Sequence, residues 1–459
     1  MNSLRFKLFG VVAIFLLILL IANFFINYTR APVLIFFVAL VGSIFFLKPT
    51  FFLMLYSVLL WVPYFLGGRF LPGFIIPEAC IYLNFVLYLI IEVARKRNVV
   101  KNILETPFLV PLAIFSASGF FVLFFANPTD SVSAAMFFRG SSVYPILVYI
   151  IFVKLIKTSR EAENIMAALA IGGLIMGALA FFLHRGYVGV EYTSHERLGG
   201  EYLAGGINFW FHPIGLATHL SSIFPISVIL WMCSKRKIIK LIGLCSFPAI
   251  LFFIIMSGTR TAWMASFAGI ICVIMLGYKY KQIKLQMIIL LSSVGLLVLS
   301  IIAMQQLLSP EVSRRVESFQ NKEVVNSFDM RLEKWQGAMK HIWEQPMGMG
   351  YTSIYPYCGF DSPHNLFLAI ALGSGVFGLM VLVWFIIRWL ILVFRRLKNS
   401  PDEEKLIYLS GIGSLIALLI NGIGDVPIYY GSNTFVLIFI VFGCTVAIAS
   451  RKNEPTCVS

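Results

Sequence analysis

Residues 365–387 read NLFLAIALGSGVFGLMVLVWFII, a stretch that contains no charged side chain. A helix needs about 20 apolar residues to cross a hydrocarbon core roughly 30 Å thick. Similar apolar runs recur along the whole chain, and they lack the alternation of apolar and polar residues that a membrane barrel strand requires. Because a helix satisfies its own backbone polar groups inside a bilayer, the pattern predicts an all-α polytopic membrane protein.

The composition agrees with this fold class. The chain has 459 residues, of which 59% are hydrophobic and 12% charged, whereas about a quarter of the residues of a soluble protein are charged. We expect about 12–14 transmembrane helices of the length that a bilayer requires. The expected spans lie near residues 8–27, 32–47, 51–66, 74–93, 107–126, 140–156, 163–183, 209–232, 241–256, 262–278, 285–304, 365–387, 406–423 and 433–450.

Three regions follow from these spans: a transmembrane bundle (1–304) with a loop at 184–208, a long loop (305–364), and C-terminal helices (365–459). The first apolar run, Leu8 to Ile26, could also be a signal peptide. Its length and the lack of a small-residue cleavage site favour a retained span.

The distribution of positive charge predicts the orientation of the chain. With the N-terminus inside, about 24 of the 36 Lys and Arg residues fall in inner loops. The net charge of +15 is thus typical of a membrane protein, and no nucleic acid partner is expected. Both termini are predicted to lie inside, with the loops 184–208 and 305–364 outside.

The seven cysteines are scattered and show neither CxxC nor Cys/His ligand spacing. This pattern predicts no disulfide framework, no metal site and no cofactor.

The long loop 305–364 is expected to contain an amphipathic helix at residues 328–344. Its apolar stripe would consist of Phe328, Leu332, Trp335, Met339 and Ile342, which recur at three- and four-residue steps. The helix could lie on the membrane surface or cap the bundle, and we favour capping. Pro346 should end it, with MGMGY following as a flexible turn.

Three of the expected spans, near 209, 262 and 365, begin on the outer side, where helix N-termini favour anions. A polar residue precedes or opens each of them: Arg197, Arg260 and His364. Each has a plainer interpretation, as a solvated loop charge, a snorkelling anchor or an interfacial histidine. In DSPHNLFL, Ser362 is expected to be the N-cap and Pro363 the first helical residue.

Together these side chains would suit a diphosphate ligand, because guanidinium groups bind phosphates in bidentate fashion. A helix N-terminus disfavours a protonated imidazole, so His364 could accept a proton from an attacking hydroxyl. No DxD-like acidic cluster occurs on the outer side, so arginine rather than a metal ion would neutralise the leaving group. The histidines at 184, 195, 212, 219 and 341 are weaker candidates.

The ordered residues Arg331, Trp335, Pro346, Gly348, Gly350, His364–Asn365–Leu366, Gly373, Gly375 and Gly378 resemble the signature of the O-antigen ligase and O-antigen polymerase family. SGTRTAWMA at Arg260 and RLGGEYLAGGIN at Arg197 resemble two further motifs of the family, the second more loosely than usual. The similarity covers roughly residues 197–380, and the N-terminal half matches in hydropathy alone.

This resemblance implies a GT-C-like, metal-independent inverting glycosyltransferase in the bacterial inner membrane. Its donor would be an undecaprenyl-diphosphate-linked glycan, and the transfer would occur at the periplasmic face. A ligase passes the glycan to lipid A–core, whereas a polymerase passes it to another glycan repeat, and we favour the ligase. By the resemblance, Arg197 and Arg260 bind diphosphate and act with His364, which activates the acceptor hydroxyl. Arg331 matches a family position in the long loop and is expected to bind diphosphate as well, with a structural contact to the loop helix as the alternative.

Two other classes compete with this hypothesis. A lipid-glycan transporter or flippase usually carries charges in mid-span and two related halves, and the sequence has few such charges and no repeat. A scaffold protein would not need arginine and histidine at three helix starts.

Overall fold

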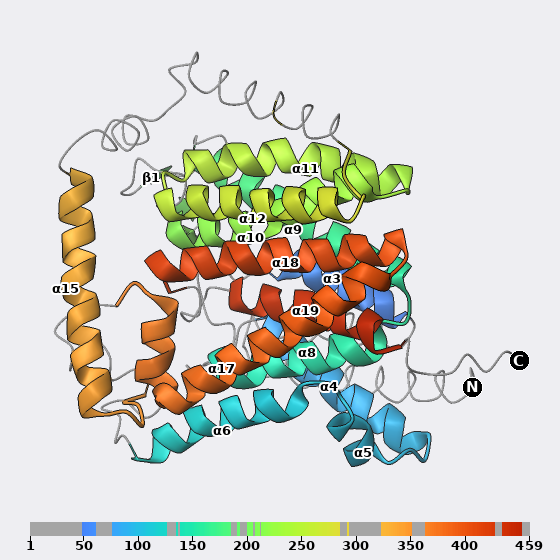
Figure 1. Cartoon of the computed structure of the whole chain (residues 1–459), viewed down its shortest axis with the longest axis horizontal. Coiled ribbons are helices and arrows are strands. Elements are labelled where there is room, and N and C mark those ends of the chain that lie inside the picture. The colour runs from blue at the N-terminus through green and yellow to red at the C-terminus, as the bar shows by residue number, and fades with distance from the viewer. Residues whose placement is uncertain are drawn as a thin grey trace, which may run out of the picture.

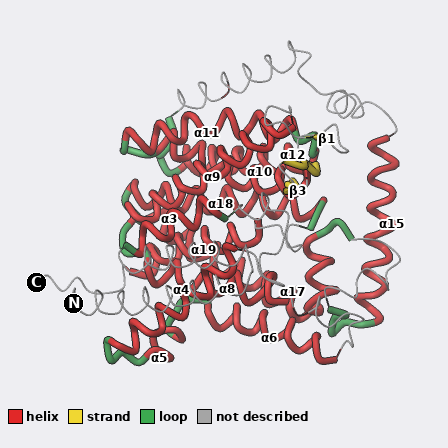
Figure 2. The backbone as a smooth tube through the Cα atoms, turned by 180° about the vertical axis from the view of Figure 1, so that it is seen from behind, coloured by secondary structure: helices red, strands yellow, loops and turns green. Residues whose placement is uncertain are grey.

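The apolar runs form long helices that lie side by side, as opposite views of the molecule make clear (Figures 1 and 2). The computed structural model describes residues 48–60, 76–125, 135, 138–184, 191–192, 200–204, 207–211, 213–284, 292, 323–350, 363–426 and 434–451. The helices are α3 (Pro49–Leu59), α4 (Ile76–Ala94), α5 (Val99–Leu104), α6 (Leu109–Phe125), the π-helix η2 (Arg139–Val143), α8 (Tyr144–Leu155), α9 (Ser159–His184), α10 (Pro213–Cys233), α11 (Lys237–Met256), α12 (Arg260–Lys279), α15 (Glu323–Glu344), α17 (Leu366–Asn399), α18 (Asp402–Gly424) and α19 (Thr434–Arg451).

Seven helices in the described part of the chain are long and apolar enough to cross a membrane: α9, α10, α11, α12, α17, α18 and α19. Shorter apolar helices include α3 and parts of α4 and α6. The helical membrane fold expected from the sequence is therefore confirmed. The spans expected near 8–27, 32–47 and 285–304 lie outside the described residues, so the total of 12–14 spans stays a prediction.

A small sheet occupies the region expected to be an outer loop. Strands β1 (Glu191–Tyr192), β2 (Gly200–Ala204) and β3 (Ile207–Phe211) pair antiparallel in the order β1-β2-β3. Tyr202 pairs with Tyr192 on one side and with Phe209 on the other. No strand was expected here from the sequence. Because β3 runs to Phe211, α10 begins at Pro213 rather than near 209.

Helix α15 crosses the bundle at one end, nearly at right angles to the long helices (Figure 1). It ends at Glu344, two residues before Pro346, as predicted, but begins earlier, at Glu323. Its buried Ala338 and half-buried Ile342 pack against Leu368 and Leu372 of α17, so the helix caps the bundle.

The predicted apolar stripe of α15 is only partly correct. Leu332 and Met339 are 40% and 44% exposed, and Trp343 is 80% exposed. Two predicted members, Trp335 and Ile342, do lie on the less exposed face, and Arg331 and Ala338 join them there at helical spacing. A charged residue, Arg331, therefore lies on the packed face, and apolar periodicity does not predict such a position.

Candidate active site

The last turn of α18 and the residue after it, Asn421–Asp425, meet several helices at once. We call this stretch, with the sequence NGIGD, the NGIGD segment. Helix α18 ends at Gly424, and Asp425 has an extended backbone. A Cβ atom on Gly422 would lie 2.9 Å from Leu366 at the start of α17, so the bare glycine lets these two helices approach closely.

His364 lies directly before α17 and faces the NGIGD segment. Its Nδ1 atom is 3.7 Å from Oδ1 of Asp425, and the two side chains are 32% and 13% exposed. This distance exceeds that of a direct hydrogen bond. The backbone φ of His364 is +46°, a left-handed conformation that is uncommon for non-glycine residues and recurs at functional sites.

Asn365, rather than Ser362, is the N-cap of α17. Its Oδ1 accepts hydrogen bonds from the backbone N–H groups of Phe367 and Leu368, at 3.0 and 3.2 Å. Its Nδ2 donates to the carbonyl oxygen of Ile423 at 3.3 Å. The expected cap, Ser362, lies outside the described residues, and His364 precedes the helix instead of occupying its first turn. One asparagine thus both caps α17 and ties it to the end of α18.

Arg260 is the first residue of α12, after a three-residue turn from the end of α11 at Met256. Gly258 in this turn has a φ of +64°, a conformation that glycine adopts without strain. The next residue, Thr261, has its methyl group against Gly424, where a Cβ atom would overlap it. The partly exposed Arg260 is therefore held one residue from a contact with the NGIGD segment.

Arg331 reaches the same segment from α15. Its Nη1 atom lies 3.5 Å from the position that a Cβ on Gly424 would take. Among the described residues, no acidic group lies within 4.0 Å of this guanidinium. Three of the four predicted site residues thus meet the NGIGD segment or directly adjoin a residue that does.

The glycines after α15 have a structural role that the sequence analysis did not assign. A Cβ on Gly348 would lie 2.6 Å from the backbone nitrogen of Gly375, and one on Gly375 would lie 2.5 Å from the oxygen of Met347. Both have positive φ, and Gly375 bends α17. Met349 N–H donates to Leu372 at 2.7 Å and Val376 N–H to Pro346 at 2.9 Å, so the expected flexible turn is held in place.

Arg197 lies outside the described residues, so its predicted role stays a prediction. The same holds for His195 and His212, and nothing is described of the His184 side chain. His219 is fully buried in α10. His341 lies on α15, with its Nδ1 3.5 Å from Glu344.

Asp425 was missed by the sequence analysis. A signal was available, because NGIGD brings a carboxylate directly after a long apolar run, on the side predicted to be outer. Nothing in the sequence links it to His364, 61 positions earlier. Within the described part of the chain, no three His, Cys, Asp or Glu side chains are grouped so as to hold a metal ion.

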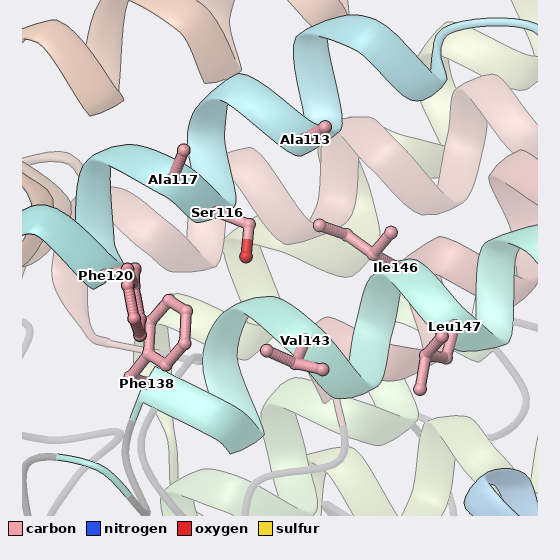
Figure 3. A pocket seen from close by; sticks show the side chains of 8 residues that line it. All are labelled: Ala113, Ser116, Ala117, Phe120, Phe138, Val143, Ile146 and Leu147. Carbon is pink, nitrogen blue, oxygen red and sulfur yellow. The ribbon is translucent and has the colours of Figure 1, made fainter. Parts of the chain in front are cut away.

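A separate apolar groove of about 350 Å³ lies between α6 and the start of α8. Figure 3 shows Ala113, Ser116 and Ala117 of α6 on one side, and Val143, Ile146 and Leu147 on the other. Phe120 and Phe138 close one end, with ring centroids 5.8 Å apart. Ser116 is the single polar residue among those that line the groove.

The amino-acid sequence was compared with models of known protein families and with curated proteins. Residues 244–383 match the family model for O-antigen ligase, Wzy_C. The match confirms the resemblance drawn from the motifs, and it includes Arg260, Arg331 and His364 but neither Arg197 nor Asp425. A comparison with curated proteins found no match.

One similar solved chain comes from work on the structural coordination of polymerization and crosslinking by a peptidoglycan synthase complex. The similarity covers 76% of this chain and 98% of the other, with 13% identity and a TM-score of 0.39. A likeness this distant says nothing about the activity of the present chain.

Proposed function

We propose that the chain is a glycan transferase of the O-antigen ligase type. It would pass a glycan from undecaprenyl diphosphate to a hydroxyl of lipid A–core at the periplasmic face of a bacterial inner membrane. The proposal is supported by what meets the end of α18: Arg331 lies close to Gly424, Asp425 faces His364, and Arg260 adjoins Thr261, which contacts Gly424. The match to the ligase family over residues 244–383 supports it independently.

In the proposed reaction, the acceptor hydroxyl attacks the sugar carbon that bears the diphosphate. The new bond joins the acceptor oxygen to this carbon, and the bond from the carbon to the diphosphate oxygen breaks with inversion. His364 takes the hydroxyl proton as a general base. The electron pair of the broken bond leaves with the diphosphate.

Asp425 would assist His364 in two ways. Its carboxylate lies on the Nδ1 side of the ring, which favours a tautomer with the proton on Nδ1 and leaves Nε2 as the base. It would also stabilise the imidazolium that forms when the proton has moved. The 3.7 Å separation would shorten in the complex with substrates, as catalytic contacts often do.

The arginines would hold the leaving group. Arg260 and Arg331 come from different helices, so their guanidinium groups can approach a diphosphate from two directions, and Arg197 is proposed as a third ligand. Because guanidinium is always charged and offers paired donors, this set can neutralise the leaving diphosphate without a metal ion.

The charge pattern supports the proposed orientation. Helix α9 begins near the turn after α10, where Arg236 pairs with Glu163 at 3.2 Å. That end of the bundle carries the Lys and Arg clusters typical of a cytoplasmic face. The arginine and histidine cluster lies at the other end of the same helices.

The test is transfer by the purified full-length chain in proteoliposomes. A labelled undecaprenyl-diphosphate glycan and lipid A–core are supplied to two samples of the proteoliposomes, one untreated and one treated with EDTA. We expect labelled lipid A–core in both samples. Product on the undecaprenyl carrier would indicate a polymerase, loss of activity with EDTA would refute metal independence, and movement of uncleaved donor across the bilayer would indicate a flippase.

A deletion strain gives an independent answer on a lipopolysaccharide gel. Loss of all glycan from the core indicates a ligase, and a core that bears a single repeat indicates a polymerase. An unchanged ladder would contradict both.

A further inference from the structure

Asn421 is a fully buried asparagine in the last turn of α18. Its Nδ2 donates to Oγ of Ser221 in α10 at 2.7 Å and to the carbonyl oxygen of Ala417 at 2.9 Å. A buried amide in a membrane bundle is costly unless it forms hydrogen bonds, and hydrogen bonds between helices hold such bundles together. This contact therefore joins α18 to α10.

The Ser221 side of this contact is equally fixed. Ser221 is fully buried, and its hydroxyl donates to the carbonyl oxygen of Thr218 at 2.9 Å. The hydroxyl proton is thus committed to α10, and its oxygen accepts from Asn421. In the bond between the two helices, Asn421 of α18 is the donor and Ser221 of α10 is the acceptor. Neither side chain can turn away without losing a hydrogen bond.

The groups of the proposed site follow Asn421 within one helical turn. The carbonyl of Ile423 accepts from Asn365, Gly424 lies against Thr261 and Arg331, and Asp425 faces His364. Asp425 directly follows the last residue of α18, so its backbone moves with that helix end. A rotation or shift of α18 at Asn421 would therefore move the Asp425 carboxylate relative to the imidazole of His364.

We propose that Asn421 is a positioning residue for the transfer reaction, which it serves through Ser221 by fixing the last turn of α18 and hence the Asp425–His364 geometry. This inference rests on the proposed function. Asn421 touches no reacting atom, and its effect passes through the NGIGD segment.

The chain contains a matched control, Asn84 in α4. Asn84 is also fully buried, and its Nδ2 donates to the carbonyl oxygen of Cys80, four residues earlier, at 2.6 Å. It lacks a described hydrogen bond to another helix. Asn84→Leu thus removes a buried amide from α4, which packs against α5 and α8, and reports the general cost of the substitution.

The experiment compares Asn421→Leu, Ser221→Ala and Asn84→Leu in proteoliposomes, with kcat and KM for the donor measured for each. We expect Asn421→Leu to lower kcat about ten- to a hundred-fold with little change in KM, since a misplacement near 1 Å can cost this much. Ser221→Ala should act in the same direction. The double variant should be no worse than Asn421→Leu alone, because the two residues act through one contact. Asn84→Leu should keep kcat.

A second readout does not depend on transfer. Cysteines replace His364 and Asp425, a short bis-methanethiosulfonate reagent links them, and mass spectrometry measures the 364–425 crosslink. Asn421→Leu should reduce this crosslink, and Asn84→Leu should not. If Asn421→Leu matches Asn84→Leu in both crosslink and kcat, the proposal is overturned. If the native chain transfers no glycan, the proposed function fails, and the crosslink still decides whether Asn421 sets this geometry.

Discussion

Two arginine-containing regions of this protein are built in opposite ways. In the first, Nε of Arg139 donates to Oε1 of Glu78 at 2.6 Å and Nη2 donates to Oε2 at 3.1 Å. Tyr82 also donates to this carboxylate, which is 1% exposed. In the second, the Arg331 guanidinium has no acid within 4.0 Å in the described part of the chain, and His364 stands 3.7 Å from Asp425.

The difference separates a structural ion pair from a candidate binding site. Glu78 and Arg139 satisfy each other across two helices, so the pair joins α4 to η2 and leaves little for a ligand. Around the NGIGD segment, by contrast, Arg331 is partly exposed with no acid within 4.0 Å in the described part of the chain, so its guanidinium can bind an anionic substrate. Arginine at a helix start therefore does not by itself mark the site, because the surrounding acids decide its role.

The strongest test of this contrast is His364→Ala. A general base contributes about a hundred- to ten-thousand-fold to rate, so we expect transfer to fall roughly a thousand-fold while donor binding and thermal stability are kept. The matched control is His341→Ala on α15, where Nδ1 of the histidine lies 3.5 Å from Glu344, and there the rate should hold. Equal rates in the two variants would remove His364 from the mechanism.

At the structural pair, Glu78→Gln should cost about 3–5 kcal/mol of stability, because it leaves Arg139 without its countercharge. The measurement is denaturant unfolding in detergent. The double replacement Glu78→Leu with Arg139→Leu should be less harmful, since it removes both charges. If the single and double variants lose the same stability, the pair is not the source of the effect.

The same arginine-to-lysine substitution, made once in each region, should have different effects. Arg260→Lys should reduce transfer about ten- to a hundred-fold and weaken donor binding, because lysine cannot offer a bidentate fork. Arg139→Lys should lower the midpoint of thermal unfolding and leave donor affinity unchanged. If Arg139→Lys weakened donor binding and Arg260→Lys only lowered the midpoint of unfolding, the roles assigned to the two arginines would be wrong.

The smallest expected effect concerns the attachment of α15. Gly348 and Gly350 both have positive φ, at +95° and +82°, but only a Cβ on Gly348 would strike the backbone of α17. Backbone strain should cost either Gly→Ala variant about 1–3 kcal/mol, and Gly348→Ala should lose more than this and speed hydrogen exchange at the end of α15, because its Cβ also meets α17. Gly350→Ala carries the same backbone strain without the collision, so a comparable loss there would argue against the contact.

The sequence predicted the features that depend on local pattern. Apolar runs located the long helices, Pro346 marked the end of α15, and motif order brought Arg260, Arg331 and His364 into one hypothesis. The roles of Asp425 and Asn421 could not be predicted, because they depend on contacts with residues 61 and 200 positions away. The three strands were not predicted because they are short. The contact between Gly348 and Gly375 was not predicted because the two glycines come from separate segments.

The distribution of the site along the chain has a consequence for biosynthesis. Arg260, Arg331 and His364 all precede α18, whereas Asp425 follows its last residue. A nascent or truncated chain that stops before α18 could insert its earlier helices and display three of the four groups, yet it would lack the carboxylate and the helix end that gathers them. The proposed reaction would therefore become possible only after α18 and Asp425 have been synthesised and inserted, late in the synthesis of the chain.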